Sequence, residues 1–283
     1  MNPVAFIDAA LDEDMPSGDA TSLATLEAAW RGEGRVLAKE DLVISGSDLA
    51  TLALERAALR VGGDVQVALH VEDGTRVAAG TVVANVRGSF AALLAGERLA
   101  LNVWMHLSGV ATQTAKHVAA AGPHGPSVLD TRKTTPLHRP WEKRAVLHGG
   151  GRNHRTNLSD GILIKDNHVD AVGDLGEAVR RARQRAHHLL RIEVEVRRLE
   201  EVDVALEAGA DALLLDNFSN EELAVAVARA RAIQPGVYLE ASGGMTAERI
   251  ASLRSIGLDA ISVGGLIHQA RWVDLSMKVA RLR

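Results

Sequence analysis

The chain has 283 residues, enough for one large domain or two ordinary ones, and 47% of them are hydrophobic, which supports a sizeable core. Its formal net charge of -4 argues against a nucleic-acid-binding protein, which needs a broad basic face. The absence of cysteine excludes disulfides and thiolate metal sites and fits a reducing cytoplasm. The first residues are acidic where a secretion signal is basic, and no apolar run is long enough to span a membrane, so neither secretion nor membrane insertion is expected.

The first hundred residues mix short helices and short strands. Apolar spacing predicts helices at 4–11 and 48–60 and strands at 35–39, 42–45, 65–71 and 77–86. The hairpin V-E-D-G-T-R-V-A-A-G resembles that of a lipoyl or biotin carrier. A carrier needs a lysine at the hairpin tip, and no lysine lies between Lys39 and Lys116, so this hairpin is interpreted as scaffold.

A long helix is predicted at 89–121, where Arg98 interrupts an Ala- and Leu-rich run and Gly109 is a candidate bend. We place a domain boundary there, with an N-terminal α/β domain at 1–108 and a second domain at 109–270. The last segment, 271–283, is expected to form a helix that packs back on the first domain.

From residue 127 onward, short apolar strands alternate with helical segments. Strands are predicted at 128–129, 162–164, 190–194, 212–215, 237–239 and 260–263, and helices at 174–186, 222–232 and 247–255. This alternation predicts a parallel sheet with helices packed against it, and the short final repeats favour a closed or nearly closed α/β barrel.

Basic residues are concentrated between residues 129 and 170. From Arg132 to Arg155 the only acidic residue is Glu142, whereas a solvated helix would mix acids with bases. The segment therefore predicts an anion-binding pocket. Its basic residues are Arg132, Lys133, Arg139, Lys143, Arg144, Arg152, Arg155 and Lys165.

Polar groups or glycines follow all six predicted strands, which is where barrel enzymes carry their active sites. One such residue would be an ordinary cap or surface ion pair, but six consecutive strand ends favour a site. They are residues 130–133, residues 165–168, Glu193 with Glu195, Asp216 with Asn217, Glu240 with residues 242–244, and Ser262 with residues 264–265.

The late glycine-rich loops suggest a phosphate site, because backbone N–H groups can approach a phosphate there. The predicted phosphate-binding residues are Ser242, Gly243, Gly244, Ser262, Gly264 and Gly265; tight turns at barrel corners are the alternative interpretation. Glu195 and Asp216, on neighbouring strands, suit a magnesium-bound polyphosphate or ribose hydroxyls. His154 alone is more typical of a structural histidine, and the lack of HExxH spacing argues against zinc.

Long ordered motifs make the chain resemble the quinolinate phosphoribosyltransferase family over nearly its whole length. They are G-D-A-T-S from Gly18, G-E-R-L-A-L-N from Gly96, L-D-T-R-K-T-T-P from Leu129, G-G-G-R-N-H-R from Gly149, L-I-K-D-N-H from Leu163, I-E-V-E-V from Ile192, L-L-L-D-N from Leu213, E-A-S-G-G from Glu240 and D-A-I-S-V-G-G-L from Asp259.

The resemblance implies an N-terminal α/β sandwich-like domain and an open, six- or seven-stranded α/β barrel in a homodimer whose sites are shared between subunits. It implies that quinolinate and 5-phosphoribosyl 1-diphosphate react with Mg²⁺, and without an organic cofactor, to give nicotinate mononucleotide, pyrophosphate and CO₂ in de novo NAD biosynthesis. By the same resemblance, the substrate-binding residues are Arg132, Lys133, His154, Arg155 and Lys165, with Arg98 supplied by the partner subunit. Glu195 and Asp216 match the acidic pair near ribose and magnesium, and Lys133, Lys165, Glu195 and Asp216 are the predicted catalytic residues.

Three positions depart from the family pattern. Leu137 stands where glycine is usual, Arg152 adds a charge inside G-G-G-x-N-H-R, and Ile267 replaces a common hydroxyl residue. The alternatives are a paralogous phosphoribosyltransferase acting on another acid, which the K-D-N-H motif from Lys165 disfavours, and a non-catalytic phospho-sugar-binding protein. The acidic pair beside the basic cluster disfavours the second.

Overall fold

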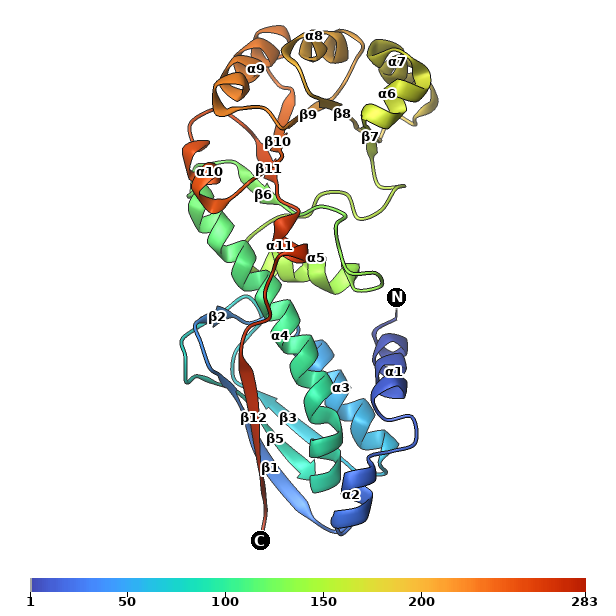
Figure 1. Ribbon diagram of the computed structural model, residues 1–283, viewed down its shortest axis with the longest axis vertical. Helices are drawn as coiled ribbons and strands as arrows, with labels where there is room; N and C mark the ends of the chain where they lie inside the picture. The colour runs from blue at the N-terminus through green and yellow to red at the C-terminus, as the bar shows by residue number, and fades with distance from the viewer. Residues whose placement is uncertain (1) are drawn as a thin grey trace. The chain divides into compact units, whose positions relative to one another are not determined.

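The computed structural model describes residues 2–283, and the chain separates into two compact units (Figure 1). Unit 1 contains the residues up to Ala115, Thr135–Gly150 and Gln269–Arg283, and unit 2 contains Lys116–Thr134 and Gly151–His268. The predicted domains, 1–108 and 109–270, are contiguous, whereas these units interleave along the chain. Residues 135–150, within the predicted range 109–270, lie in unit 1.

Unit 1 is built on an antiparallel sheet with the strand order β12-β1-β5-β3. Helices α3 and α4 lie over one face of this sheet (Figure 1). The elements of this part of the chain are α1 (Pro3–Asp14), α2 (Ala20–Thr25), β1 (Arg31–Ala38), β2 (Leu42–Val43), α3 (Ser47–Arg60), β3 (Val65–Leu69), β4 (Arg76–Val77), β5 (Val82–Ser89), α4 (Phe90–Ala121), α5 (Arg139–His148) and β12 (Leu275–Arg281).

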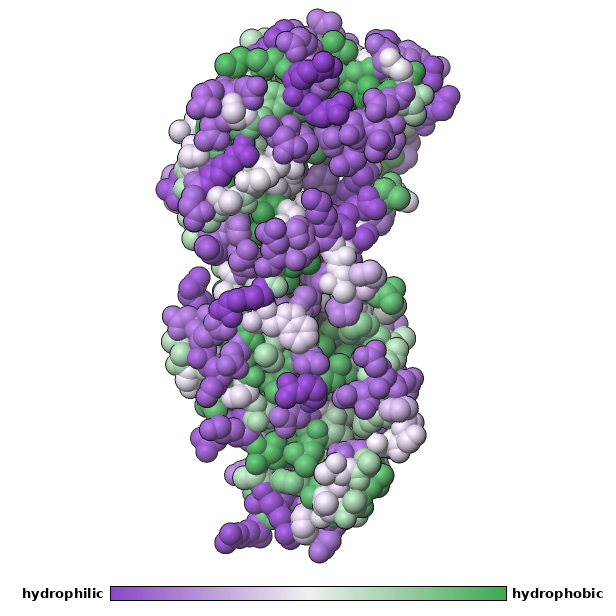
Figure 2. Space-filling model, viewed as in Figure 1, coloured by the Kyte–Doolittle hydropathy of each residue, from purple (hydrophilic) through white to green (hydrophobic). Residues whose placement is uncertain are grey.

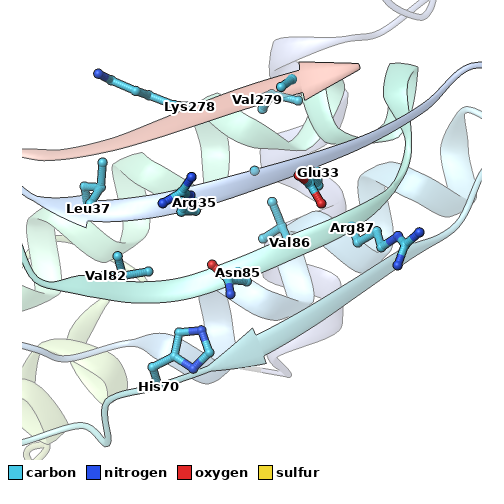
Figure 3. A pocket seen from close by; sticks show the side chains of 12 residues that line it. Glu33, Arg35, Leu37, His70, Val82, Asn85, Val86, Arg87, Lys278 and Val279 are labelled. Carbon is cyan, nitrogen blue, oxygen red and sulfur yellow. The ribbon is translucent and has the colours of Figure 1, made fainter. Parts of the chain in front are cut away.

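The sheet also carries an open pocket of about 960 Å³ whose lining mixes charged or polar side chains with apolar ones. Figure 3 shows side chains from adjacent strands standing around it, among them Arg35 of β1, Asn85 and Arg87 of β5, and Lys278 of β12. His70, directly after β3, completes the row.

The prediction of a C-terminal helix at 271–283 is wrong. Leu275–Arg281 forms strand β12, which pairs antiparallel with β1 from Ala38↔Leu275 to Gly32↔Arg281. Val273, Leu275 and Met277 are buried, with a less buried residue between each pair. This is the period-two burial of a strand with one covered face.

Helix α4 runs without interruption from Phe90 to Ala121, so Gly109 does not break it. Gly109 instead lets the backbone of Arg271 pack closely against the helix, because a Cβ atom at Gly109 would lie 2.2 Å from the carbonyl oxygen of Arg271. The segment leading into β12 thus crosses α4 at Gly109, where no side chain blocks its approach.

Gly109→Ala is therefore expected to lower the free energy of unfolding by roughly 2 kcal/mol, as overpacking typically does. The sign is informative, because alanine in an ordinary helix interior is more favourable than glycine by about 1 kcal/mol. Urea denaturation would measure the change. Gly236→Ala is the matched control and should be neutral or slightly stabilising, since no heavy atom of the described residues, apart from its chain neighbours, lies within 4 Å of its Cβ position. A stabilised Gly109→Ala variant would contradict the packing argument.

Unit 2 is a parallel sheet of six strands with the order β6-β11-β10-β9-β8-β7, covered on its outer side by helices (Figure 1). The described strands β6 and β7 have one neighbouring strand each, which confirms the expected open α/β barrel; a single bridge between Leu129 and Arg152 extends the β6 edge. The elements are β6 (Ser127–Leu129), β7 (Ile162–Ile164), α6 (Asp166–Val172), α7 (Leu175–Arg185), β8 (Ile192–Val196), α8 (Leu199–Glu207), β9 (Ala212–Asp216), α9 (Asn220–Ile233), β10 (Tyr238–Ser242), α10 (Ala247–Ser252), β11 (Ala260–Ser262) and α11 (Gly265–His268).

Residue alternation sorts the barrel strands into an apolar outer face and a polar inner face. In β8, Ile192, Val194 and Val196 are fully buried under the helices, so Glu193 and Glu195 face the interior. The covering helices are hydrophilic outside, and Figure 2 shows hydrophilic residues over the visible surface of α6 and α7. Among the described helices, none combines the length and the apolarity needed to cross a membrane.

Candidate active site

Lys165 and Glu195 form an ion pair at the carboxyl end of the barrel sheet. Lys165 directly follows β7, and its Nζ lies 3.0 Å from Oε2 of Glu195 on the adjacent strand β8. The Glu195 side chain is 9% exposed and that of Lys165 is 46% exposed. His168 fixes the start of α6, because its Nδ1 accepts the Lys165 backbone N–H at 2.9 Å. A cation is thus held beside a carboxylate that faces the barrel interior.

Asp216 ends β9, the next strand, on the same face as Glu195. The Asn217 side chain donates to Oδ2 of Asp216 at 2.7 Å, and Asn217 itself has φ 61°. Gly243 packs against this residue, since a Cβ at Gly243 would lie 2.1 Å from Oδ1 of Asn217. With φ 95°, Gly243 also has a backbone conformation that L side chains rarely adopt. The glycine therefore brings the loops after β9 and β10 into contact.

Arg249 holds this glycine loop and was not among the predicted residues. Its guanidinium donates to the carbonyl oxygen of Gly243 at 2.6 Å and also to the carbonyl oxygen of Phe218. It spans from α10 back to the loops after β10 and β9, so the loop geometry depends on one side chain.

Lys133 and Gly264 meet at the other edge of the sheet. A Cβ at Gly264 would lie 2.9 Å from Cδ of Lys133 and 3.2 Å from Nε2 of His268. The missing side chain lets the lysine stem cross the loop after β11. Gly265 follows as the first residue of α11, and Ser262, the last residue of β11, is buried. The phosphate-binding role of Ser242, Gly243, Gly244, Ser262, Gly264 and Gly265 stays a prediction.

His154 lies among carboxyl groups inside the barrel. Its Nε2 is 3.1 Å from Oε2 of Glu193 and 3.7 Å from Oε1 of Glu240, and its backbone N–H donates to Oδ1 of Asp130 at 2.9 Å. Burial, followed by the neighbouring charge of Glu193, raises the pKa of Glu240 to about 7. The strand-end pattern includes Glu193 and Glu240 without predicting a role for them, although strand alternation places both on the inner face.

Arg155 follows His154 and donates to the carbonyl oxygen of Gly161 at 3.3 Å. Burial lowers the pKa of this guanidinium, and the charge of Arg132 nearby lowers it further. Arginine stays protonated in proteins despite such shifts. Two guanidinium groups close enough to repel each other are typical of an anion-binding pocket, because a bound anion relieves the repulsion.

The predicted magnesium pair fits an ion carried by a substrate. Oε2 of Glu195 accepts from Lys165, and Oδ2 of Asp216 accepts from Asn217. The second oxygen of each carboxylate could therefore bind the ion. Mg²⁺ commonly takes one or two carboxylates together with substrate phosphates and water. The sets of three possible ligands that the described residues bring together are His106, His138 and Glu142, and His154, Glu193 and Glu240; neither includes Glu195 or Asp216.

Arg98 is exposed on the part of α4 that belongs to unit 1. Of the three departures from the family pattern, Leu137 has φ 67°, a conformation in which glycine is unstrained, which explains why glycine is usual there. Arg152 uses its backbone for the bridge to Leu129, and Ile267 is buried in α11.

Comparison with known proteins agrees with this architecture. The quinolinate phosphoribosyl transferase C-terminal domain matches residues 110–278, and the N-terminal domain of the same family matches residues 19–108. A Mycobacterium leprae protein named nicotinate-nucleotide pyrophosphorylase [carboxylating] is 41% identical over 269 residues, covering 95% of this chain and 94% of that protein. A Synechocystis protein named as a probable enzyme of this kind is 39% identical over 271 residues, covering 96% of this chain and 90% of that protein.

A solved structure has the same fold over almost the entire chain. The crystal structure of NadC from Streptococcus pyogenes superposes with a TM-score of 0.92 at 37% identity, covering 99% of this chain and 96% of that one. Both domains of the sequence family, relatives of matching length and this structure agree, so the chain belongs to the quinolinate phosphoribosyl transferase family.

Proposed function

We propose that the chain transfers the phosphoribosyl group of 5-phosphoribosyl 1-diphosphate to quinolinate, with decarboxylation, giving nicotinate mononucleotide, pyrophosphate and CO₂ for NAD biosynthesis. The observation that carries this proposal is the contact between Lys165 and Glu195. It joins a basic group and an acidic group of the barrel at the carboxyl end of the sheet. A pyridine diacid and an activated ribose need these two kinds of surface side by side.

The basic residues would bind the diacid. Quinolinate carries adjacent carboxylates, and Arg132, Arg155 and Lys165 supply two guanidinium forks and one ammonium. Lys133, whose stem crosses Gly264, would reach the same region from the neighbouring loop. Binding of the dianion would also relieve the repulsion between Arg132 and Arg155.

The acidic residues would act on the ribose. As pyrophosphate leaves C1 of the ribose, positive charge develops there, and the fixed carboxylates of Glu195 and Asp216 would stabilise it. The pyridine nitrogen then forms the bond to C1. The ion pair keeps the Glu195 carboxylate oriented before substrate arrives, which lowers the cost of reorganisation. The glycine loops after β10 and β11 would hold the phosphate.

Decarboxylation follows from the bond to nitrogen. The alkylated, positively charged ring accepts the electron pair of the breaking carbon–carbon bond at C2, CO₂ leaves, and C2 then takes one proton. Little acid–base assistance is needed before CO₂ departs, so orientation would carry most of the rate. Mg²⁺ would neutralise pyrophosphate charge when it accompanies the diphosphate substrate, with Glu195 and Asp216 as its protein ligands, directly or through water.

A homodimer with shared sites is part of the proposal. Arg98 is an exposed cation on α4 in unit 1, and the family resemblance assigns this position to the site of the partner subunit. The proposed compartment is the cytoplasm, whose reducing conditions suit a chain without cysteine.

The test is an assay with quinolinate labelled at the 2-carboxylate, 5-phosphoribosyl 1-diphosphate and Mg²⁺. We expect labelled CO₂, nicotinate mononucleotide and pyrophosphate in equal amounts, and no product when the metal is chelated. A product that retains the label, or turnover of another acid but not of quinolinate, would contradict the proposal.

A further inference from the structure

Three carboxyl groups surround one imidazole inside the barrel. Asp130 binds the backbone N–H of His154, Glu193 contacts its Nε2 at 3.1 Å, and Glu240 lies 3.7 Å from the same nitrogen. Asp130 and Glu240 are almost completely buried, at 0% and 1% exposure. Acidic side chains are seldom buried in this way without a specific partner or role.

The hydrogen bonds define the protonation state of His154. The backbone N–H of Arg155 donates to Nδ1 of His154 at 2.7 Å, so Nδ1 carries a lone pair and the proton is on Nε2. That proton is donated to the carboxylate of Glu193. Because both ring nitrogens contact protein groups, the effect of His154 on a substrate would pass through Arg155.

Glu240 is the second carboxyl group near Nε2 of His154, and burial raises its pKa, so its charged form is disfavoured. Its Oε1 is buried and, among the described residues, has no hydrogen-bond partner, while the Ser262 hydroxyl bonds to the carboxyl group. The other titratable groups that face it are Glu193 of β8, His154 and Asp130, with Tyr238 on its own strand. Its pKa of about 7 follows from burial and the charge of Glu193, so below that pH His154 has one carboxylate at Nε2 rather than two.

We propose that Glu193 and Glu240 are positioning residues that hold His154 in one tautomer and, through it, fix the backbone of Arg155 for the diacid. The inference rests on the proposed function in one respect, the binding of a substrate carboxylate by Arg155. When Glu240 ionises, its proton passes to solvent, and a second carboxylate charge then lies 3.7 Å from Nε2 of His154. The Nε2 proton is drawn from Glu193 toward Glu240, which turns the ring and weakens the bond from the Arg155 N–H to Nδ1.

Kinetics of Glu240→Gln test the substrate side, because glutamine copies the uncharged acid and cannot ionise. In the unchanged protein, kcat/KM for quinolinate should fall about tenfold per pH unit once the pH exceeds the pKa of Glu240. In Glu240→Gln, kcat/KM for quinolinate should stay constant to higher pH. KM for 5-phosphoribosyl 1-diphosphate should change little with pH in both proteins. Glu221→Gln, on the outer helix α9, is the matched control, and its kcat/KM for quinolinate should depend on pH as in the wild-type protein. The same alkaline fall in Glu240→Gln, or equal effects on both substrates, would overturn the inference.

Nitrogen-15 NMR of the histidines tests the tautomer without any substrate. The signal lost in His154→Gln identifies His154, and at about pH 6.5 it should show a neutral ring protonated at Nε2. A ring protonated at Nδ1, or an imidazolium, would overturn the inference. Because this measurement needs no turnover, it separates the two proposals: an inactive protein with the expected tautomer would contradict the proposed function and leave the positioning arrangement supported.

Discussion

Lys165→Ala is expected to lower kcat/KM for quinolinate by about a thousandfold, which corresponds to roughly 4 kcal/mol of transition-state stabilisation. Two effects combine in this change. The diacid loses an ammonium partner, and Glu195, whose side chain is 9% exposed, loses the charge that lies 3.0 Å from its carboxylate. Steady-state kinetics with each substrate varied in turn would measure the loss.

The fold should be intact in this variant, because the Lys165 side chain is 46% exposed and fills no part of the core. Circular dichroism and the thermal midpoint would confirm this. Lys116→Ala is the matched control, since Lys116 is an exposed lysine in the part of α4 that belongs to unit 2. Kinetics of Lys165→Ala equal to those of the control would remove Lys165 from the site.

Mixing two inactive variants, Arg98→Ala and Lys165→Ala, is expected to restore about a quarter of the activity if sites are shared across a two-fold dimer. In a mixed dimer, the barrel of the Arg98→Ala chain keeps its own Lys165 and receives Arg98 from the partner. The other barrel lacks both groups. Half of the randomly mixed dimers are of this kind, and each has one complete site. Activity after exchange of subunits would be measured.

The control for this experiment is a mixture of Lys165→Ala and Glu195→Ala chains. Both positions lie in the same barrel, so every barrel in a mixed dimer still lacks one of them and no recovery is expected. Activity that stays absent in fully exchanged dimers of Arg98→Ala and Lys165→Ala would show that Arg98 does not serve the partner's barrel.

Much of the barrel could be predicted from the sequence because its strands are short apolar runs ended by polar residues or glycine. The six predicted strands each correspond to one of β6 to β11, with shifts of a few residues. The adjacency of Lys165 and Glu195 also follows from this pattern, once their strands are known to be neighbours. Parallel strands put their carboxyl ends at one edge, which brings distant residues together.

Other features depend on tertiary contacts that the sequence does not display. In the last segment, basic residues alternate with apolar ones, a pattern that fits a short helix as well as a strand. It forms strand β12 because the edge of β1 offers backbone groups for it to pair with. Arg249 resembles any surface arginine of a helix until the loops after β9 and β10 are known to meet. The inner positions of Glu193 and Glu240, in contrast, could have been found from strand alternation alone.

The most direct test of the central claim is a crystal structure of the protein with quinolinate bound. The two carboxylates are expected to contact Arg132, Arg155 and Lys165, with the pyridine nitrogen directed toward Glu195 and Asp216. Quinolinate bound elsewhere, away from these three cations, would contradict that claim.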